Sequence, residues 1–172
     1  MQAFFLYLQG FNFCYGGIIT MDALISITGT VISDGGQPDI IELVTAGRYF
    51  SKDGSRYISY IESEVTGLYG IRTTLKVEGQ DSVTLIRNGT AKSRLIIAKG
   101  QRQHCHYGTE YGDLLVGISG CHIASSLDDV GGELSFDYTL DINSNTISHN
   151  KVFISVREAK KQDVKSNEYR CQ

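Results

Sequence analysis

Alternation of apolar and polar residues is the strongest structural signal in this chain, and it is clearest between residues 132 and 143. Apolar side chains occupy every second position there, and polar side chains occupy the positions between them; the apolar set is Leu134, Phe136, Tyr138, Leu140 and Ile142. A period of two residues is typical of a β-strand with one face in the core and the other in solvent. The segment therefore predicts a half-buried antiparallel strand.

Similar short runs recur along the chain, separated by turns rich in Gly, Asn and Asp. They predict strands over 23–31, 39–50, 56–64, 71–77, 82–88, 93–98, 103–107 and 113–119, and a last strand over 151–157. Asn88 and Gly89 are a strong signal for a two-residue hairpin turn. About eight to ten strands at nearly regular spacing favour an all-β antiparallel barrel or sandwich over a parallel sheet with helices.

Composition limits the class of protein. The chain has 172 residues, of which 41% are hydrophobic, and this predicts one folded domain rather than disorder. A formal net charge of -3 lacks the basic excess that nucleic-acid-binding proteins use, so we expect no nucleic acid as partner. The cysteines at positions 14, 105, 121 and 171 form no Cys-x-x-Cys pair, which favours the reducing cytoplasm.

The first 20 residues are apolar and aromatic and contain no Lys or Arg. A secretory signal begins with positive residues, and a spanning helix needs about 20 continuous apolar residues, so we expect neither secretion nor a membrane partner. Gly16 and Gly17 require purine-rich codons shortly before Met21, which resembles a ribosome-binding site translated in frame. We expect a non-native or disordered extension over 1–20, a β-barrel domain over 21–158 and a polar tail over 159–172. The alternative for 1–20 is an apolar arm that packs on the barrel or on a partner.

Four segments resemble the YwiB-like bacterial proteins: Ile58–Gly67, Val83–Gly89, Glu110–Gly117 and Gly131–Asn143. The resemblance extends over residues 22–158, and it rests on the ordered succession of the segments. The family is a domain of unknown function with a calycin-like β-barrel, similar to lipocalins and fatty-acid-binding proteins. The resemblance implies this fold. It implies no activity and no catalytic residues.

Strand parity places charged side chains on apolar faces. Glu62 and Glu64 share a face with Tyr60 in the strand expected over 56–64, and Arg87 lies on the apolar face of its own strand. A small barrel can hold one small ligand, and an inward arginine can bind a carboxylate or phosphate. We therefore name Tyr60, Glu62, Glu64, Arg87 and Tyr138 as candidate ligand-binding residues. In the alternative interpretation, these charges pair with one another or lie in solvent at the strand ends.

A second group of residues has the chemistry of a metal site. His104 and His106 face the same side of an expected strand, and His122 or Cys121 supplies a third ligand for zinc or copper if the strands pair in register. The paired spacings of structural zinc sites are absent, so we expect ordinary hairpin residues, no metal and no cofactor. Cys105 faces away from both neighbouring histidines, and no Cys–His nucleophile is predicted.

Two functions remain open on the sequence. The first is a non-enzymatic protein that binds a small amphipathic or acidic ligand inside the barrel. The second is an interaction scaffold for another protein, with the barrel completely filled by its own side chains. The two differ in whether inward residues such as Phe136, Tyr138 and Ile58 leave space, which the sequence does not determine.

Overall fold

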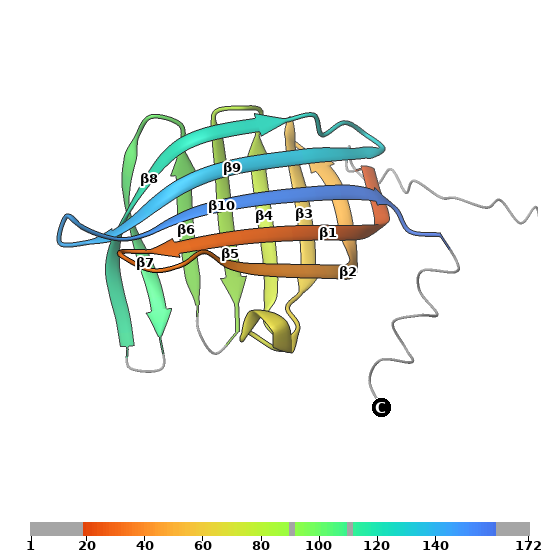
Figure 1. Cartoon of the computed structure of the whole chain (residues 1–172). Coiled ribbons are helices and arrows are strands. Elements are labelled where there is room, and N and C mark those ends of the chain that lie inside the picture. The colour runs from red at the N-terminus through yellow and green to blue at the C-terminus, as the bar shows by residue number, and fades with distance from the viewer. Residues whose placement is uncertain (1–18, 90–91, 110–111, 161–172) are drawn as a thin grey trace, which may run out of the picture.

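The computed structural model describes residues 19–89, 92–109 and 112–160, which form a closed antiparallel barrel (Figure 1). Its ten strands are β1 (Ile19–Ser33), β2 (Asp39–Lys52), β3 (Ser55–Ile61), β4 (Arg72–Glu78), β5 (Ser82–Asn88), β6 (Ser93–Ala98), β7 (Arg102–Thr109), β8 (Gly112–Ser125), β9 (Gly131–Ile142) and β10 (Asn145–Glu158). Strands consecutive in the chain are neighbours, and β10 closes the barrel against β1. The predicted all-β fold is confirmed. Residues 1–18 and 161–172, most of the predicted extension and tail, lie outside the described residues.

Tight turns connect two pairs of neighbouring strands. Asp53 and Gly54, between β2 and β3, have φ values of 51° and 76°. Asn143 and Ser144, between β9 and β10, have φ values of 52° and 66°. Positive φ at both central residues is the requirement of the type I′ turn, whose twist matches that of the strands it connects. Local turn chemistry therefore sets the register of these two hairpins.

The hairpin between β5 and β6 differs from its prediction. β5 ends at Asn88 and β6 begins only at Ser93, so the connection is longer than two residues. Neither Asn88 nor Gly89 has the positive φ that a type I′ turn requires. The prediction of a two-residue turn at this position is wrong, although the two strands do pair as a hairpin.

β3 is shorter than predicted and ends at Ile61. The chain then forms a single 3₁₀ turn, η1 (Glu64–Thr66), before it returns to β4. Glu62 N–H donates to Ile71 O at 2.8 Å and Gly70 N–H donates to Glu62 O at 3.1 Å, which closes the base of this loop. In Figure 1, η1 lies beside β2, and the two elements are in contact. Among the described residues, no helix is long and apolar enough to cross a membrane.

β2 extends beyond the end of β3. β3 pairs with β2 only from Gly47 to Lys52, so residues 39–46 of β2 pair with β1 alone among the described strands. Contact between η1 and β2 takes the place of strand pairing in this part of the wall. The wall of the barrel is therefore completed by a loop at one position.

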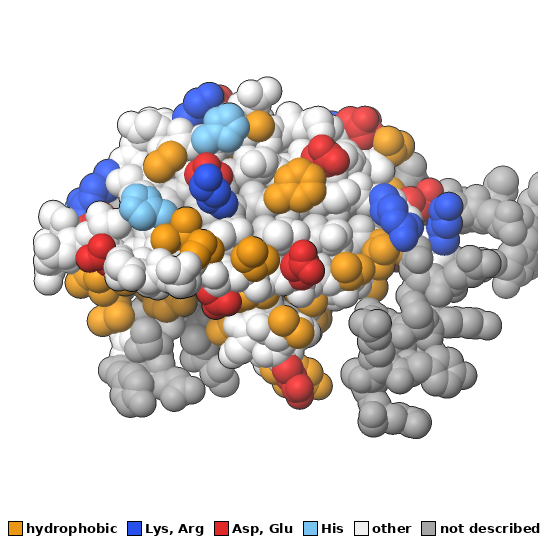
Figure 2. All heavy atoms as spheres, viewed as in Figure 1, with side chains coloured by type: hydrophobic (Ala, Val, Ile, Leu, Met, Phe, Trp, Pro, Cys, Tyr) orange, Lys and Arg blue, Asp and Glu red, His pale blue; other side chains and the backbone are white. Residues whose placement is uncertain are grey.

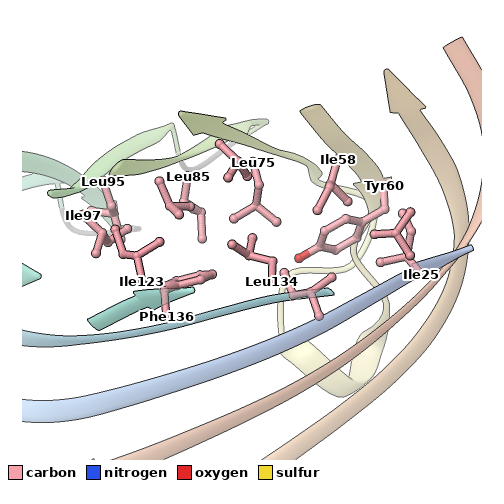
Figure 3. Packing of buried hydrophobic residues seen from close by; sticks show 14 of the residues in the cluster. Ile25, Ile58, Tyr60, Leu75, Leu85, Leu95, Ile97, Ile123, Leu134 and Phe136 are labelled. Carbon is pink, nitrogen blue, oxygen red and sulfur yellow. The ribbon is translucent and has the colours of Figure 1, made fainter. Parts of the chain in front are cut away.

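Inward side chains form an apolar core that receives a contribution from each strand. Figure 3 shows Leu75, Leu85 and Leu95 pointing from one wall toward Ile123 and Phe136 on the opposite wall. Full burial of one such side chain contributes about 1.5–3 kcal/mol, so this core is the main source of stability. The outer surface in Figure 2 instead carries scattered acidic, basic and histidine side chains, with apolar ones between them. Closure of the barrel gives each strand a buried inner face and a solvent-exposed outer face, and this explains the predicted alternation of apolar and polar residues.

Candidate functional site

A cavity of about 170 Å³ lies inside the barrel, at the end where β3 gives way to η1. Much of its lining is apolar and comprises Ile27, Val31, Ile41, Leu43, Leu68, Leu75, Leu85, Phe136, Val152 and Ile154. The polar residues of the lining are Thr30, Tyr60, Glu62, Thr66, Arg87, Tyr138, Asn150 and Lys151. An apolar cavity of roughly 150 Å³ admits a benzene molecule, so the space is sufficient for a small ligand.

Glu62 and Arg87 form the charged end of this cavity. The Glu62 side chain is only 2% exposed, and its Oε1 accepts a hydrogen bond of 2.6 Å from Thr73 Oγ1. Arg87 Nε lies 4.0 Å from the same Oε1, which is too long for a hydrogen bond. Arg87 Nε is also buried and has no hydrogen-bond partner among the described residues. The two charges therefore face each other, and the donor capacity of Arg87 Nε remains unused.

Two tyrosines lie at the same end of the cavity. Burial raises the pKa of Tyr60, and the negative charge of Glu62 raises it further. Burial also raises the pKa of Tyr138. The positive charge of Arg87 acts in the opposite direction but is the smaller effect. Both phenols therefore stay protonated at neutral pH and can donate as well as accept hydrogen bonds. Figure 3 shows the Tyr60 ring extending into the interior of the barrel.

The structure brings four of the five predicted ligand-binding residues together. Tyr60, Glu62, Arg87 and Tyr138 all line the cavity, as strand parity predicts. Glu64 does not, because it is exposed in η1. The expectation of an inward Glu64 is wrong, since β3 ends before the alternation of inward and outward positions reaches it.

Sequence reasoning missed several residues that shape the cavity. Thr73, which binds Glu62, shares the inward parity of Leu75, and this signal identifies it. Gly29 lines the cavity from β1, where a Cβ atom would approach only the Ile41 carbonyl oxygen, at 4.0 Å. The contribution of Leu68 has no signal of this kind, because it depends on the path of the loop after η1.

The predicted metal candidates do not gather into a site. His104 and His106 are both exposed on the same face of β7, and His104 Nε2 lies 3.1 Å from Arg102 Nη1. His122 lies beside an irregularity in β8 and is in register with Asp137 of β9. Within the ranges that the structure describes, no group of three His, Cys, Asp or Glu side chains is placed to hold a metal ion.

An ion pair on the outer surface connects β7 to β9. Arg102 donates to both carboxylate oxygens of Asp141, at 2.9 Å and 2.6 Å. The hydrogen bond from Arg102 holds the pKa of Asp141 below its ordinary value of 3.8, and the Ser144 backbone N–H contributes in the same direction. Bidentate geometry of this kind fixes the relative position of the two strands.

The chain has relatives in both sequence and structure. Residues 25–154 match the family described as Domain of unknown function (DUF1934). The chain belongs to this family. The uncharacterized beta-barrel protein YwiB of Bacillus subtilis (strain 168) is 30% identical over 113 residues, which are 66% of this chain and 78% of that protein.

The fold has a counterpart among solved structures. The crystal structure of the ywiB protein from Bacillus subtilis has a TM-score of 0.71 to this chain at 25% sequence identity. The match covers 82% of this chain and 94% of the solved one. The YwiB-like resemblance and the barrel it implies are thus confirmed, and the relative is itself described as a β-barrel protein.

Proposed function

We propose that the protein binds a small amphipathic ligand inside its barrel, without catalysis. The cavity carries this proposal, because it combines about 170 Å³ of space with a buried donor, Arg87 Nε, that has no partner among the described residues. A buried polar group without a hydrogen bond costs about 1–3 kcal/mol, and a bound acceptor removes this cost. The proposed site of action is the cytoplasm, which the free thiols of Cys105 and Cys121 support.

The lining defines the general form of the ligand. Most of the wall is aliphatic or aromatic, which favours an apolar body of about the size of a benzene ring. The polar residues gather around Glu62 and Arg87, which favours one polar group on that body. Gly29 supplies part of the space, because a larger residue at this position would project into the cavity.

The first test is a titration of the ¹⁵N-labelled chain with toluene and with benzyl alcohol, followed by two-dimensional NMR. We expect saturable shifts at backbone amides around the cavity. Gly29→Val should abolish these shifts, because its side chain would occupy the cavity and a β-branched residue suits a strand. Thr28→Val is the matched control, since Thr28 is the outward neighbour of Gly29 and does not line the cavity. Absence of shifts with the parent chain, or equal binding by Gly29→Val, would contradict the proposal.

A separate observation supports the second candidate, an interaction module. Residues 39–46 of β2 pair with β1 alone among the described strands, and Ile40 and Val44 there are 61% and 60% exposed. η1 contacts β2 but does not pair with it as a strand. An unpaired strand edge can add a strand from another chain, for which a second copy is the simplest partner. Sedimentation velocity tests this: self-association that Val44→Lys removes would support it, and a monomer at every concentration would contradict it.

A further inference from the structure

We propose that the polar group of the ligand is electrically neutral and carries both a hydrogen-bond donor and an acceptor, as a carboxamide or an alcohol does. This inference rests on the proposed binding function and names the ligand class for the same cavity. It departs from the acidic ligand that an inward arginine alone suggests. The charges and the free hydrogen-bonding groups at the polar end of the cavity carry the argument.

The charges at this end already balance. Glu62 and Arg87 carry opposite formal charges, and the distance from Nε to Oε1 is 4.0 Å. An anionic ligand would gain Arg87 but would place a second negative charge beside a carboxylate that is 2% exposed. A cationic ligand would gain Glu62 but would place a second positive charge beside the Arg87 guanidinium. Because an unbalanced charge is costly beside a carboxylate and a guanidinium that are largely buried, both charged classes are disfavoured.

Lys151, the third charged residue in the cavity lining, leaves this balance unchanged. It is an exposed residue of β10, whereas its neighbours Asn150 and Val152 are buried and half-buried. Strand alternation therefore directs the Lys151 ammonium group toward solvent, and its contribution to the wall comes from atoms near the backbone.

The hydrogen-bonding capacity at this end is complementary to a neutral group. Arg87 Nε offers a donor without a partner among the described residues, and the Glu62 carboxylate has acceptor sites beyond the one that Thr73 uses. At 4.0 Å the two side chains do not bond each other. A carboxamide satisfies both at once, because its carbonyl oxygen accepts from Arg87 and its N–H donates to Glu62. A hydroxyl group does the same through its single oxygen.

The test uses five ligands that share a benzene ring and differ in their polar group: toluene, benzyl alcohol, benzamide, benzoate and benzylamine, the last protonated at neutral pH. Each is titrated into the ¹⁵N-labelled full chain. We expect benzamide or benzyl alcohol to bind tightest, at least about tenfold more tightly than benzoate and benzylammonium. Toluene should bind more weakly than both neutral polar ligands, because it leaves the Arg87 donor unpaired.

Two variants test whether the balance of charge between Glu62 and Arg87 determines the order of ligand affinities. Glu62→Gln removes the negative charge and leaves Arg87 unbalanced, so the preference should shift by about tenfold or more toward benzoate. Arg48→Gln is the matched control, because the Arg48 side chain is 69% exposed and does not line the cavity. The order measured on the parent chain needs no variant, so the test holds even if Glu62→Gln fails to fold.

The outcomes separate this inference from the function on which it rests. If benzoate or benzylammonium binds tightest, or if toluene equals benzamide, the barrel binds ligands but the inference is wrong. An order that Glu62→Gln leaves unchanged would overturn it as well. If none of the five ligands binds, the proposed function itself fails. Tightest binding by a neutral polar ligand, with the shift toward benzoate in Glu62→Gln, is the result that supports the inference.

Discussion

Arg87→Met is expected to destabilise the barrel, because it leaves the buried carboxylate of Glu62 without its counter-charge. Methionine retains much of the aliphatic stem of arginine, so the change chiefly removes charge. At the Nε to Oε1 distance of 4.0 Å, the attraction is about 4 kcal/mol for an effective dielectric constant of about 20. The guanidinium no longer needs to be desolvated, which offsets part of this loss. We expect a net decrease of about 2–3 kcal/mol in the free energy of unfolding.

A double-mutant cycle with Glu62→Gln isolates the interaction. Urea unfolding followed by far-UV circular dichroism gives the free energy for the parent, both single variants and the double variant. The loss caused by Arg87→Met should shrink by about 2 kcal/mol in the Glu62→Gln background, because the carboxylate charge is then absent. Arg48→Met is the control: its pair with Asp22 spans 3.9 Å at the exposed surface and should cost less than about 1 kcal/mol. A loss below about 1 kcal/mol for Arg87→Met, or an equal loss in both backgrounds, would refute this reasoning.

Three further predictions concern stability. Gly47→Ala should lower the free energy of unfolding by about 1–3 kcal/mol, because its Cβ would lie 2.4 Å from a backbone oxygen of β3, whereas Gly29→Ala has room and should not. Asp141→Asn should reduce the loss in the free energy of unfolding as the pH is lowered. Arg102 lowers the pKa of Asp141, so its stabilisation is present above the ordinary value of 3.8 and is lost as the pH falls further. Burial raises the pKa of Tyr49 to about 12, so its stabilisation is present below pH 10 and is lost as the pH rises through 12; Tyr49→Phe should reduce this alkaline loss, measured by circular dichroism.

Each of these predictions has a contrary outcome. Equal urea midpoints for Gly47→Ala and Gly29→Ala would show that the close approach of β2 to β3 relaxes without cost. An acid limb that Asp141→Asn leaves unchanged would place the acid sensitivity at other carboxylates. An alkaline transition that Tyr49→Phe leaves unchanged would show that its buried hydroxyl, which donates to Asp128 O at 2.5 Å, contributes nothing to the alkaline limb.

Alternation predicts the strands of this fold well, because the parity of each strand is tied to burial in the barrel. The same signal correctly directs Glu62 and Arg87 inward. The signal fails at Glu64. Alternation predicts which face of the sheet a residue within a strand occupies, but it does not predict the residue at which the strand ends. It fails also at Asn88, where the length of the connection depends on how far apart β5 and β6 finish.

The cavity lay beyond prediction for a related reason. Its volume depends on the stagger of ten strands around the barrel and on a loop that replaces β3 beside β2. Neither quantity is encoded in the parity of a single strand. Gly29 illustrates the limit: its inward position follows from alternation, but whether the missing side chain leaves a void depends on what the opposite walls supply.

The register of the sheet explains why the polar group of a ligand would lie at one defined end of the cavity. Tyr60, Thr73 and Arg87 are direct cross-strand neighbours on β3, β4 and β5, and together they form a polar row. The next inward row consists of Ile58, Leu75 and Leu85 and is entirely apolar. Glu62 follows the end of β3 and reaches back to Thr73, which brings its carboxylate to the polar row.

A ligand with one polar group therefore has a single favourable orientation, with that group at the polar row and its apolar body against the row below. The reverse orientation would bury the polar group among aliphatic side chains and leave Arg87 Nε unpaired. Because strand pairing fixes both rows, this orientation is a property of the barrel itself. Amides of the polar row should consequently respond more strongly than those of the apolar row when benzamide replaces toluene.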